Sequence, residues 1–144
     1  MKEEIVIRNL IEFDEIILAE MYCRLNTDTF IWMAPGTFSN EDFERDTSGE
    51  EILVAVLGDQ LVGFVSVKHS ESLIHHLYID SKTQGKGIGK VLLDSGVELI
   101  NKRPVFLNCR VKNERALNFY KKYGFEIDGK ADDPPDDYYK MRLY

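Results

Sequence analysis

The feature that most constrains the fold is a glycine-rich segment between a β-rich run and a helical pattern. The segment reads Gln84-Gly85-Lys86-Gly87-Ile88-Gly89. Residues 73–80 before it are β-rich, and apolar residues after it recur at helical spacing as far as residue 101. Another β-rich run follows at 104–110. This order predicts a right-handed β-α-β unit with two parallel strands.

The other β-rich runs predict further strands, which we expect to pair antiparallel. They cover residues 5–7, 52–57, 61–68, 125–128 and 138–143. Gly58-Asp59-Gln60 joins two of them as a tight hairpin turn, and an acidic, proline-containing turn is predicted at 132–137. We therefore expect an α+β fold with a three-layer α/β arrangement. Its sheet is mixed and mostly antiparallel, with about six or seven strands and about four helices.

Four segments have helical character, at residues 10–25, 39–45, 88–101 and 113–123. In the first, the predicted apolar face consists of Phe13, Ile16, Ile17 and Met21. Ser39 and Asp42 form a capping signal for the second, which lies inside a variable flap at 26–51. Gly124 closes the last helix.

Composition bounds the kind of protein. A length of 144 residues predicts a single domain over 1–144. Eighteen basic against 25 acidic residues give a net charge of −7, which argues against a nucleic-acid partner. The longest apolar runs are far shorter than a membrane span needs. Two cysteines and an acidic start predict a cytoplasmic protein.

Three glycines in the loop predict a phosphate-binding concavity. Without side chains, consecutive backbone N–H groups can turn toward one anion. The helix that follows adds the positive end of its dipole, and Lys86 and Lys90 add local positive charge. A ligand that carries a pyrophosphate is therefore expected.

Two common phosphate loops do not match the spacing. In the dinucleotide fingerprint, Lys90 occupies the third glycine position and Val105 the position of the acidic residue. In the triphosphate loop, Gly89-Lys90 is followed by Val91, and Gln84 replaces the first glycine. A dinucleotide-dependent oxidoreductase is therefore disfavoured.

The sequence resembles the GNAT superfamily of acyl-CoA-dependent N-acyltransferases over residues 4 to 144. One family signature, Gln/Arg-x-x-Gly-x-Gly/Ala at a helix start, corresponds to residues 84–89. A second corresponds to Asn113-x-x-Ala116-x-x-Phe119-Tyr120-x-x-x-Gly124-Phe125. The resemblance implies direct transfer of acetyl from acetyl-CoA to a primary amine of a small molecule or peptide. A non-catalytic, regulatory acyl-CoA-binding module is the alternative.

The resemblance also implies where acetyl-CoA would bind. The strands at 73–80 and 104–110 would splay apart, so that strand backbone near Leu77 pairs with the pantetheine arm, and the glycine loop would hold the pyrophosphate. The second signature helix would line the acetyl end. The cofactor-binding residues implied are Leu77, Tyr78, Ile79, Gln84, Gly85, Lys86, Gly87, Ile88, Gly89, Lys90, Asn113, Ala116, Phe119 and Tyr120.

Amine acetylation requires a base more than an acid. Freeing an amine of pKa about 10.4 at pH 7 costs roughly 4 kcal/mol, whereas a thiol of pKa about 8.5 leaves more easily. By resemblance to arylalkylamine acetyltransferases, His75 is the first candidate base and His76 the second. Strand alternation would send them to opposite faces unless a bulge intervenes. Because they would point apart, no metal site is expected.

Other candidates have two interpretations each. Tyr120 would be the general acid by resemblance, or a packed aromatic. Asn113 is a helix cap, a ligand contact or both. Cys109 is expected to pack rather than react, which favours direct transfer.

The acceptor remains open in the sequence. Acidic residues of the flap attract a cationic amine or form a solvated face; they are Glu41, Asp42, Glu44, Asp46, Glu50 and Glu51. Aromatic residues of the helix and flap form an acceptor wall or a satellite core; they are Tyr22, Phe30, Trp32 and Phe38. A homodimer is compatible with the resemblance, with residues 138–144 as its seam.

Overall fold

The computed structural model describes residues 4–133 and 136–144. The strands are β1 (Ile5–Asn9), β2 (Glu51–Leu57), β3 (Gln60–Lys68), β4 (Leu73–Ile79), β5 (Val105–Arg110), β6 (Glu126–Asp133) and β7 (Asp136–Leu143). The helices are α1 (Asp14–Thr29), α2 (Asp42–Thr47), α3 (Ile88–Ile100) and α4 (Glu114–Tyr123). Two 3-10 turns are η1 (His69–Glu71) and η2 (Ser81–Thr83).

The strands form one seven-stranded sheet in the order β1-β2-β3-β4-β5-β7-β6. β4 and β5 pair in parallel, and the other neighbouring strands pair antiparallel. Helix α3 connects the parallel pair, so the predicted β-α-β unit and the mixed sheet are confirmed.

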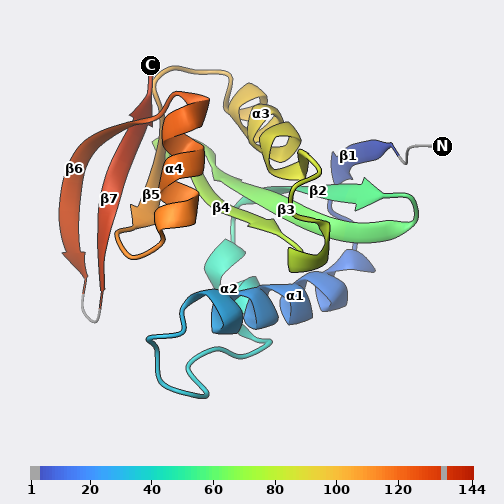
Figure 1. Ribbon diagram of the computed structural model, residues 1–144. Coiled ribbons are helices and arrows are strands. Elements are labelled where there is room, and N and C mark those ends of the chain that lie inside the picture. Colours follow the sequence, from blue (N-terminus) through green and yellow to red (C-terminus); the bar gives the residue numbers. More distant parts are fainter. Residues whose placement is uncertain (1–3, 134–135) are drawn as a thin grey trace.

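The sheet is the middle of three layers (Figure 1). Helices α3 and α4 lie on one face and α1 and α2 on the other. Alternation along β3 serves both faces: Val65 packs into the larger core under α3, and Phe64 into the smaller core with α1 and α2. Each face of the central strands is therefore covered.

The apolar face predicted for α1 is wrong. Of the four residues expected there, only Met21 is buried; the Phe13 and Ile16 side chains are 88% and 83% exposed. The helix begins at Asp14, later than expected, and its buried stripe continues through Tyr22 and Leu25. An ion pair between Asp14 and Arg8 of β1 fixes the start of the helix against the sheet, and spacing alone did not reveal this contact.

That ion pair makes stability depend on acidity. Arg8 donates two hydrogen bonds to the buried Asp14 carboxylate, which outweigh burial and hold its pKa below the ordinary 3.8. A depressed folded-state pKa contributes stability above the unfolded-state value, and this is lost as pH falls through the folded value. We expect Asp14→Asn to unfold at lower urea than wild type at pH 7, with the difference shrinking below about pH 4. Urea titrations from pH 7 to 3 test this, with the exposed neighbour Glu15→Gln as control; a constant difference would contradict it.

The C-terminal strands are longer than expected. The predicted turn at 132–137 is wrong at its ends, because Asp132 and Asp133 pair with Asp137 and Asp136 as the last rungs of the hairpin. Residues 134 and 135 lie outside the described residues. β7 also lies between β5 and β6, so its backbone is already paired on both sides. The dimer seam expected at 138–144 therefore cannot form by adding a strand to β7; β6 is the edge strand at this end of the sheet.

Candidate active site

The parallel strands separate within the sheet. β4 and β5 pair only at Leu73–Phe106 and Ile74–Leu107 within the described residues. Beyond Ile74, β4 continues to Ile79 beside β3, while β5 continues to Arg110 beside β7. The facing backbone groups of the diverging strands are thus available to a ligand. The predicted splay is present.

A cleft of about 530 Å³ occupies the splay and reaches the glycine loop. Except for Lys86, every residue predicted to bind the cofactor lines this cleft, and so do both candidate histidines. The cleft is also lined by residues that were not predicted, among them Thr29, Asn108, Arg110 and Arg115. Position in the cleft is a geometric fact, whereas each residue's role stays a prediction.

The glycine loop has the backbone geometry that the motif requires. Gly85 and Gly87 have φ angles of 86° and 80°, the left-handed region that L side chains rarely adopt. A Cβ added to either residue would meet nothing within 4 Å, so the backbone faces open space. Gly87 also caps α3. The first-turn N–H groups of this helix are oriented for an anion.

The two histidines do not point apart as expected. A β-bulge between Ser66 and Val67 leaves His75 without a partner in the β3–β4 register. The imidazole rings lie together, with centroids 4.0 Å apart. Both approach Glu50, and one ring nitrogen of each histidine and one carboxylate oxygen of Glu50 lie within 4.8 Å of one another. The reason given for expecting no metal site is therefore wrong, because the bulge overrides simple alternation.

Glu50 lies in the loop before β2, and its side chain is only 5% exposed. Its Oε2 atom contacts Nδ1 of His75, and its Oε1 atom lies 3.5 Å from Nδ1 of His76 without a hydrogen-bond partner in the described structure. Burial would raise the pKa of Glu50, but the two imidazoles and the Ser66 hydroxyl outweigh burial and lower the pKa to about 2. Glu50 is therefore an ionised carboxylate at neutral pH.

His76 is held on both sides. Its Nδ1 atom lies 2.8 Å from the Ser66 hydroxyl, and its Nε2 atom lies 3.3 Å from the hydroxyl of Tyr22 on α1. Tyr22 donates its own proton to Asp46 of α2 at 2.8 Å. Burial lowers the pKa of His76, although the nearby Glu50 carboxylate opposes this. A neutral imidazole that donates from Nε2 and accepts at Nδ1 satisfies these contacts.

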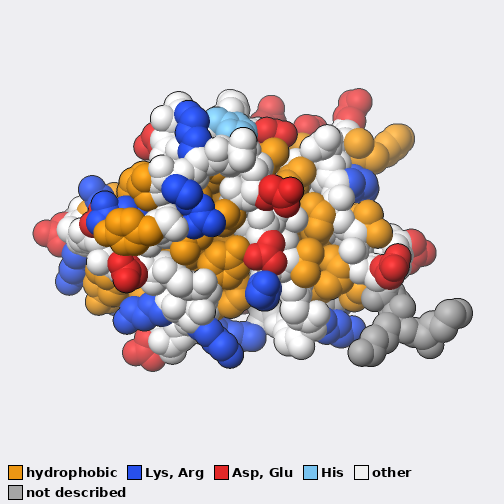
Figure 2. Space-filling model, turned by 90° about the horizontal axis from the view of Figure 1, so that it is seen from above, with side chains coloured by type: hydrophobic (Ala, Val, Ile, Leu, Met, Phe, Trp, Pro, Cys, Tyr) orange, Lys and Arg blue, Asp and Glu red, His pale blue; other side chains and the backbone are white. Residues whose placement is uncertain are grey.

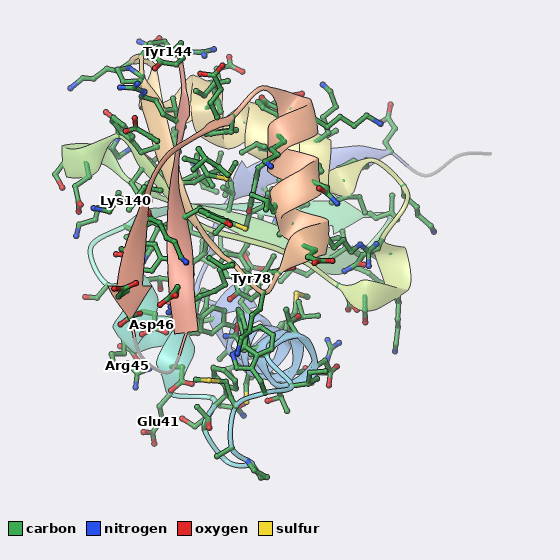
Figure 3. The ribbon with its side chains drawn as sticks, turned by 60° about the vertical axis from the view of Figure 1, so that its left-hand side comes forward. Glu41, Arg45, Asp46, Tyr78, Lys140 and Tyr144 are labelled. Carbon is green, nitrogen blue, oxygen red and sulfur yellow. The ribbon has the colours of Figure 1, made fainter. Side chains whose placement is uncertain are left out.

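A second aromatic contact connects the same strand to α1. Tyr78 projects from β4 to the α1 side of the sheet and donates to Asn26, and Figure 3 shows it on the side of the sheet where α1 and α2 lie. Its ring stacks on Phe64 with centroids 5.4 Å apart. The Tyr78 side chain therefore packs against the smaller core, and the residue also lines the cleft.

The second signature helix brings two predicted residues to the cleft. Asn113 caps α4, accepting from the Ala116 N–H at 3.3 Å, so the predicted cap is confirmed; it also lines the cleft, and its contact with a ligand stays a prediction. Burial raises the pKa of Tyr120, which therefore carries its proton at neutral pH. Its ring packs against Phe119 and Phe125.

Cys109 is 4% exposed and belongs to the core under α3, although it also contributes to the cleft wall. Burial raises its thiol pKa to about 11, so it stays protonated at neutral pH.

We expect Cys109→Ala to keep most of the activity, and Cys109 to alkylate slowly with iodoacetamide at pH 8. Peptide mass spectrometry after incubation with acetyl-CoA tests this; an acetylated Cys109 peptide would contradict direct transfer.

The acidic and aromatic residues of the flap and α1 do not all form an acceptor site, nor do they all form a solvated face or a satellite core. None of the six acidic residues lines the cleft, as far as the described residues show. Asp42 is buried and binds the Ser39 N–H, which explains the capping signal. Phe30 alone of the four aromatic residues lines the cleft; it packs on Trp32 and Phe38 as a satellite cluster, whereas Tyr22 is in the core.

Glu50, Tyr22 and Asp46 were not singled out by sequence as partners of the histidines. Tyr22 lies on α1, Asp46 on α2 and Glu50 in the loop before β2, so their contacts with the histidines require these segments to meet at β4. The only signal was the adjacency of His75 and His76, which marks the position but not its partners.

In this protein the parallel strands of a mixed sheet separate, and a glycine loop and the start of a helix lie at the end of the gap. This arrangement is that of the CoA-dependent acyltransferases. A family model for the acetyltransferase (GNAT) domain matches residues 19–132, well over half of the chain. The chain therefore belongs to the GNAT acetyltransferase family, and the resemblance seen in the sequence is confirmed.

Individual relatives agree with this assignment. The chain is 34% identical to the peptidyl-lysine N-acetyltransferase YjaB of Escherichia coli K12 over 76 residues, covering 51% of this chain and 48% of that protein. The alignment thus spans about half the length of this curated relative. The solution structure of apo YjaB has a TM-score of 0.78 at 26% identity, covering 97% of each chain. The Thermoplasma acidophilum PaiA N-acetyltransferase, solved with coenzyme A, shares the fold at 22% identity and a TM-score of 0.78, covering 97% of this chain and 98% of that chain.

Proposed function

We propose that the protein transfers an acetyl group from acetyl-CoA directly to a primary amine of a small molecule or peptide. The observation that carries this proposal is the cleft between β4 and β5, which connects an open glycine loop to His75 and Tyr120. The relatives, one of them a peptidyl-lysine acetyltransferase, support acetyl transfer to an amine.

The residues present fit acetyl-CoA as a cosubstrate. Open backbone at Gly85 and Gly87 would receive the pyrophosphate, and Lys90, whose side chain is 68% exposed, would add positive charge. Unpaired backbone of β4 beyond Ile74 would receive the pantetheine amides. The cofactor-binding roles given to residues 77–79, 84–90, 113, 116, 119 and 120 rest on this placement.

The chemistry then needs two proton transfers. The amine nitrogen bonds to the thioester carbonyl carbon, and the C–S bond breaks with its electron pair on sulfur. One proton passes from nitrogen to a histidine base, for which His75 is our first choice and His76 the second. One proton passes from the Tyr120 hydroxyl to the departing thiolate. The products are the N-acetylated amine and the free CoA thiol.

The setting and partners are part of the proposal. Cys23 and Cys109 are both free thiols, which supports a reducing, cytoplasmic location. None of the described helices is long and apolar enough to cross a membrane. Basic and acidic side chains are interspersed on the face seen in Figure 2, as expected of a protein without a nucleic-acid partner. Whether the protein forms a homodimer can be measured by light scattering.

A thiol-release assay with a panel of amines tests the function. We expect release of CoA thiol from acetyl-CoA with at least one amine, and N-acetyl product in equal amount by mass spectrometry. Thermal stabilisation by CoA without turnover across the panel would support the alternative, an acyl-CoA-binding module. Neither stabilisation nor turnover would refute both.

A further inference from the structure

The candidate base does not act alone in the structure: a buried carboxylate contacts it from another part of the chain. Glu50 precedes β2, whereas His75 lies on β4, across β3 in the sheet. The bulge opposite Ser66 turns His75 toward this carboxylate. The Glu50 side chain is 5% exposed, against 38% for His75, so one partner is buried and the other reaches the cleft.

The contact determines which ring nitrogen of His75 carries a proton. Oε2 of an ionised Glu50 can only accept a hydrogen bond, so the Nδ1 atom that contacts it must be the donor. A neutral His75 in this arrangement has no proton on Nε2. That nitrogen, on the opposite side of the ring, can accept one.

His76 has the opposite arrangement. Its Nε2 atom donates to Tyr22, because Tyr22 gives its own proton to Asp46, and Ser66 occupies Nδ1. Its side chain is 9% exposed, and neither nitrogen is left for an acceptor. The contacts therefore give the adjacent histidines different roles. His76 links β4 to α1 and α2, whereas His75 has a ring nitrogen that can take a proton.

We propose that Glu50 is a positioning residue for acetyl transfer, whose carboxylate orients His75 through Nδ1–H and leaves Nε2 to take the proton of the acceptor amine. The inference rests on the proposed function and assigns His75, rather than His76, as the base. The carboxylate does not touch the substrate; it also stabilises the imidazolium that forms when His75 takes the proton.

Glu50→Gln removes the negative charge of the carboxylate but keeps an oxygen that can accept a hydrogen bond from His75. We expect kcat/KM to fall about 10-fold or more. The variant also removes the negative charge that contacts the imidazole, so the acid side of the pH–rate profile should shift from that of wild type. Other charged and titratable groups act on Glu50 and the histidines, directly or through a neighbour. They are Asp46, Tyr22, His76, Lys68, Tyr78 and Arg110. None of them changes in this variant, so the shift reports on Glu50.

A matched control exists on the same side of the molecule. His69 and Glu51 form an exposed hydrogen bond at 2.8 Å, outside the cleft. Glu51→Gln should leave both rate and pH profile unchanged. Glu50→Asp should restore part of the rate, because it restores the charge. CoA-dependent thermal stabilisation verifies that each variant is folded and binds the cosubstrate.

A second readout does not depend on activity. The chain has three histidines, so long-range ¹H–¹⁵N spectra, assigned with single His→Gln variants, can report which ring nitrogen of each is protonated. We expect the proton on Nδ1 of His75 and on Nε2 of His76, and loss of the first preference in Glu50→Gln. If no amine is acetylated but the spectra show these protonation states, the proposed function is wrong, whereas the contact between Glu50 and His75 is supported.

Three results would overturn the proposal. One is an active Glu50→Gln enzyme with the rate and pH profile of the Glu51→Gln control. Another is a wild-type His75 protonated on Nε2. The third is a bound divalent cation whose removal by a chelator abolishes activity. A cation would have to displace Ser66 or Tyr22 from His76, so we expect spectra and rates to be unchanged by EDTA.

Discussion

Tyr120→Phe is expected to lower kcat for acetyl transfer by about 100-fold, the lower end of general-acid effects, because a thiol is already a fair leaving group. Burial raises the pKa of the Tyr120 hydroxyl, so it remains a proton donor throughout the neutral range. The hydroxyl makes no hydrogen bond to the described residues, so its removal leaves no partner unsatisfied. The phenyl ring keeps its packing against Phe119 and Phe125.

The measurement is thiol release at saturating acetyl-CoA, with CoA affinity measured separately. Tyr123→Phe is the matched control: it lies on the same helix, and its hydroxyl binds Asp94 away from the cleft. We expect the control to turn over at nearly the wild-type rate. Full turnover in Tyr120→Phe would remove this residue from the mechanism and leave protonation of the thiolate to solvent.

Gly87→Ala is expected to weaken CoA binding at least 10-fold. Gly87 has a φ of 80°, so an L residue there costs about 1–2 kcal/mol if the loop keeps its shape. Relaxing that strain would rotate the N–H groups at the start of α3 away from the anion. A methyl group would also enter the open space where the pyrophosphate is proposed to lie.

Isothermal titration with CoA tests this prediction, and Gly36→Ala separates strain from binding. Gly36 has the same φ of 80° and the same open surroundings, but does not line the cleft. Both variants should lose thermal stability, by about 2–4 °C for each kcal/mol. Only Gly87→Ala should lose affinity. Unchanged CoA affinity in a folded Gly87→Ala protein would contradict the proposed phosphate site.

Local patterns predicted much of the fold correctly. The glycine loop, the hairpin through Gly58 and the β-α-β unit all depend on residues close in sequence, and the structure has each of them. The errors arose where distant segments decide the outcome. Phe13 and Ile16 fit a helical period, yet they are exposed because contact with Arg8 and the sheet selects a different face of α1.

Short motifs at fixed spacing were enough to identify the family and the glycine loop, and to name Tyr120 and His75 as candidate residues. The placement of the two histidines, by contrast, depends on tertiary structure. A bulge in β3–β4 pairing turns both rings toward Glu50, and packing of α1 and α2 brings Tyr22 and Asp46 to His76. Strand register and helix packing depend on the summed contacts of the whole chain, and no local pattern encodes that sum.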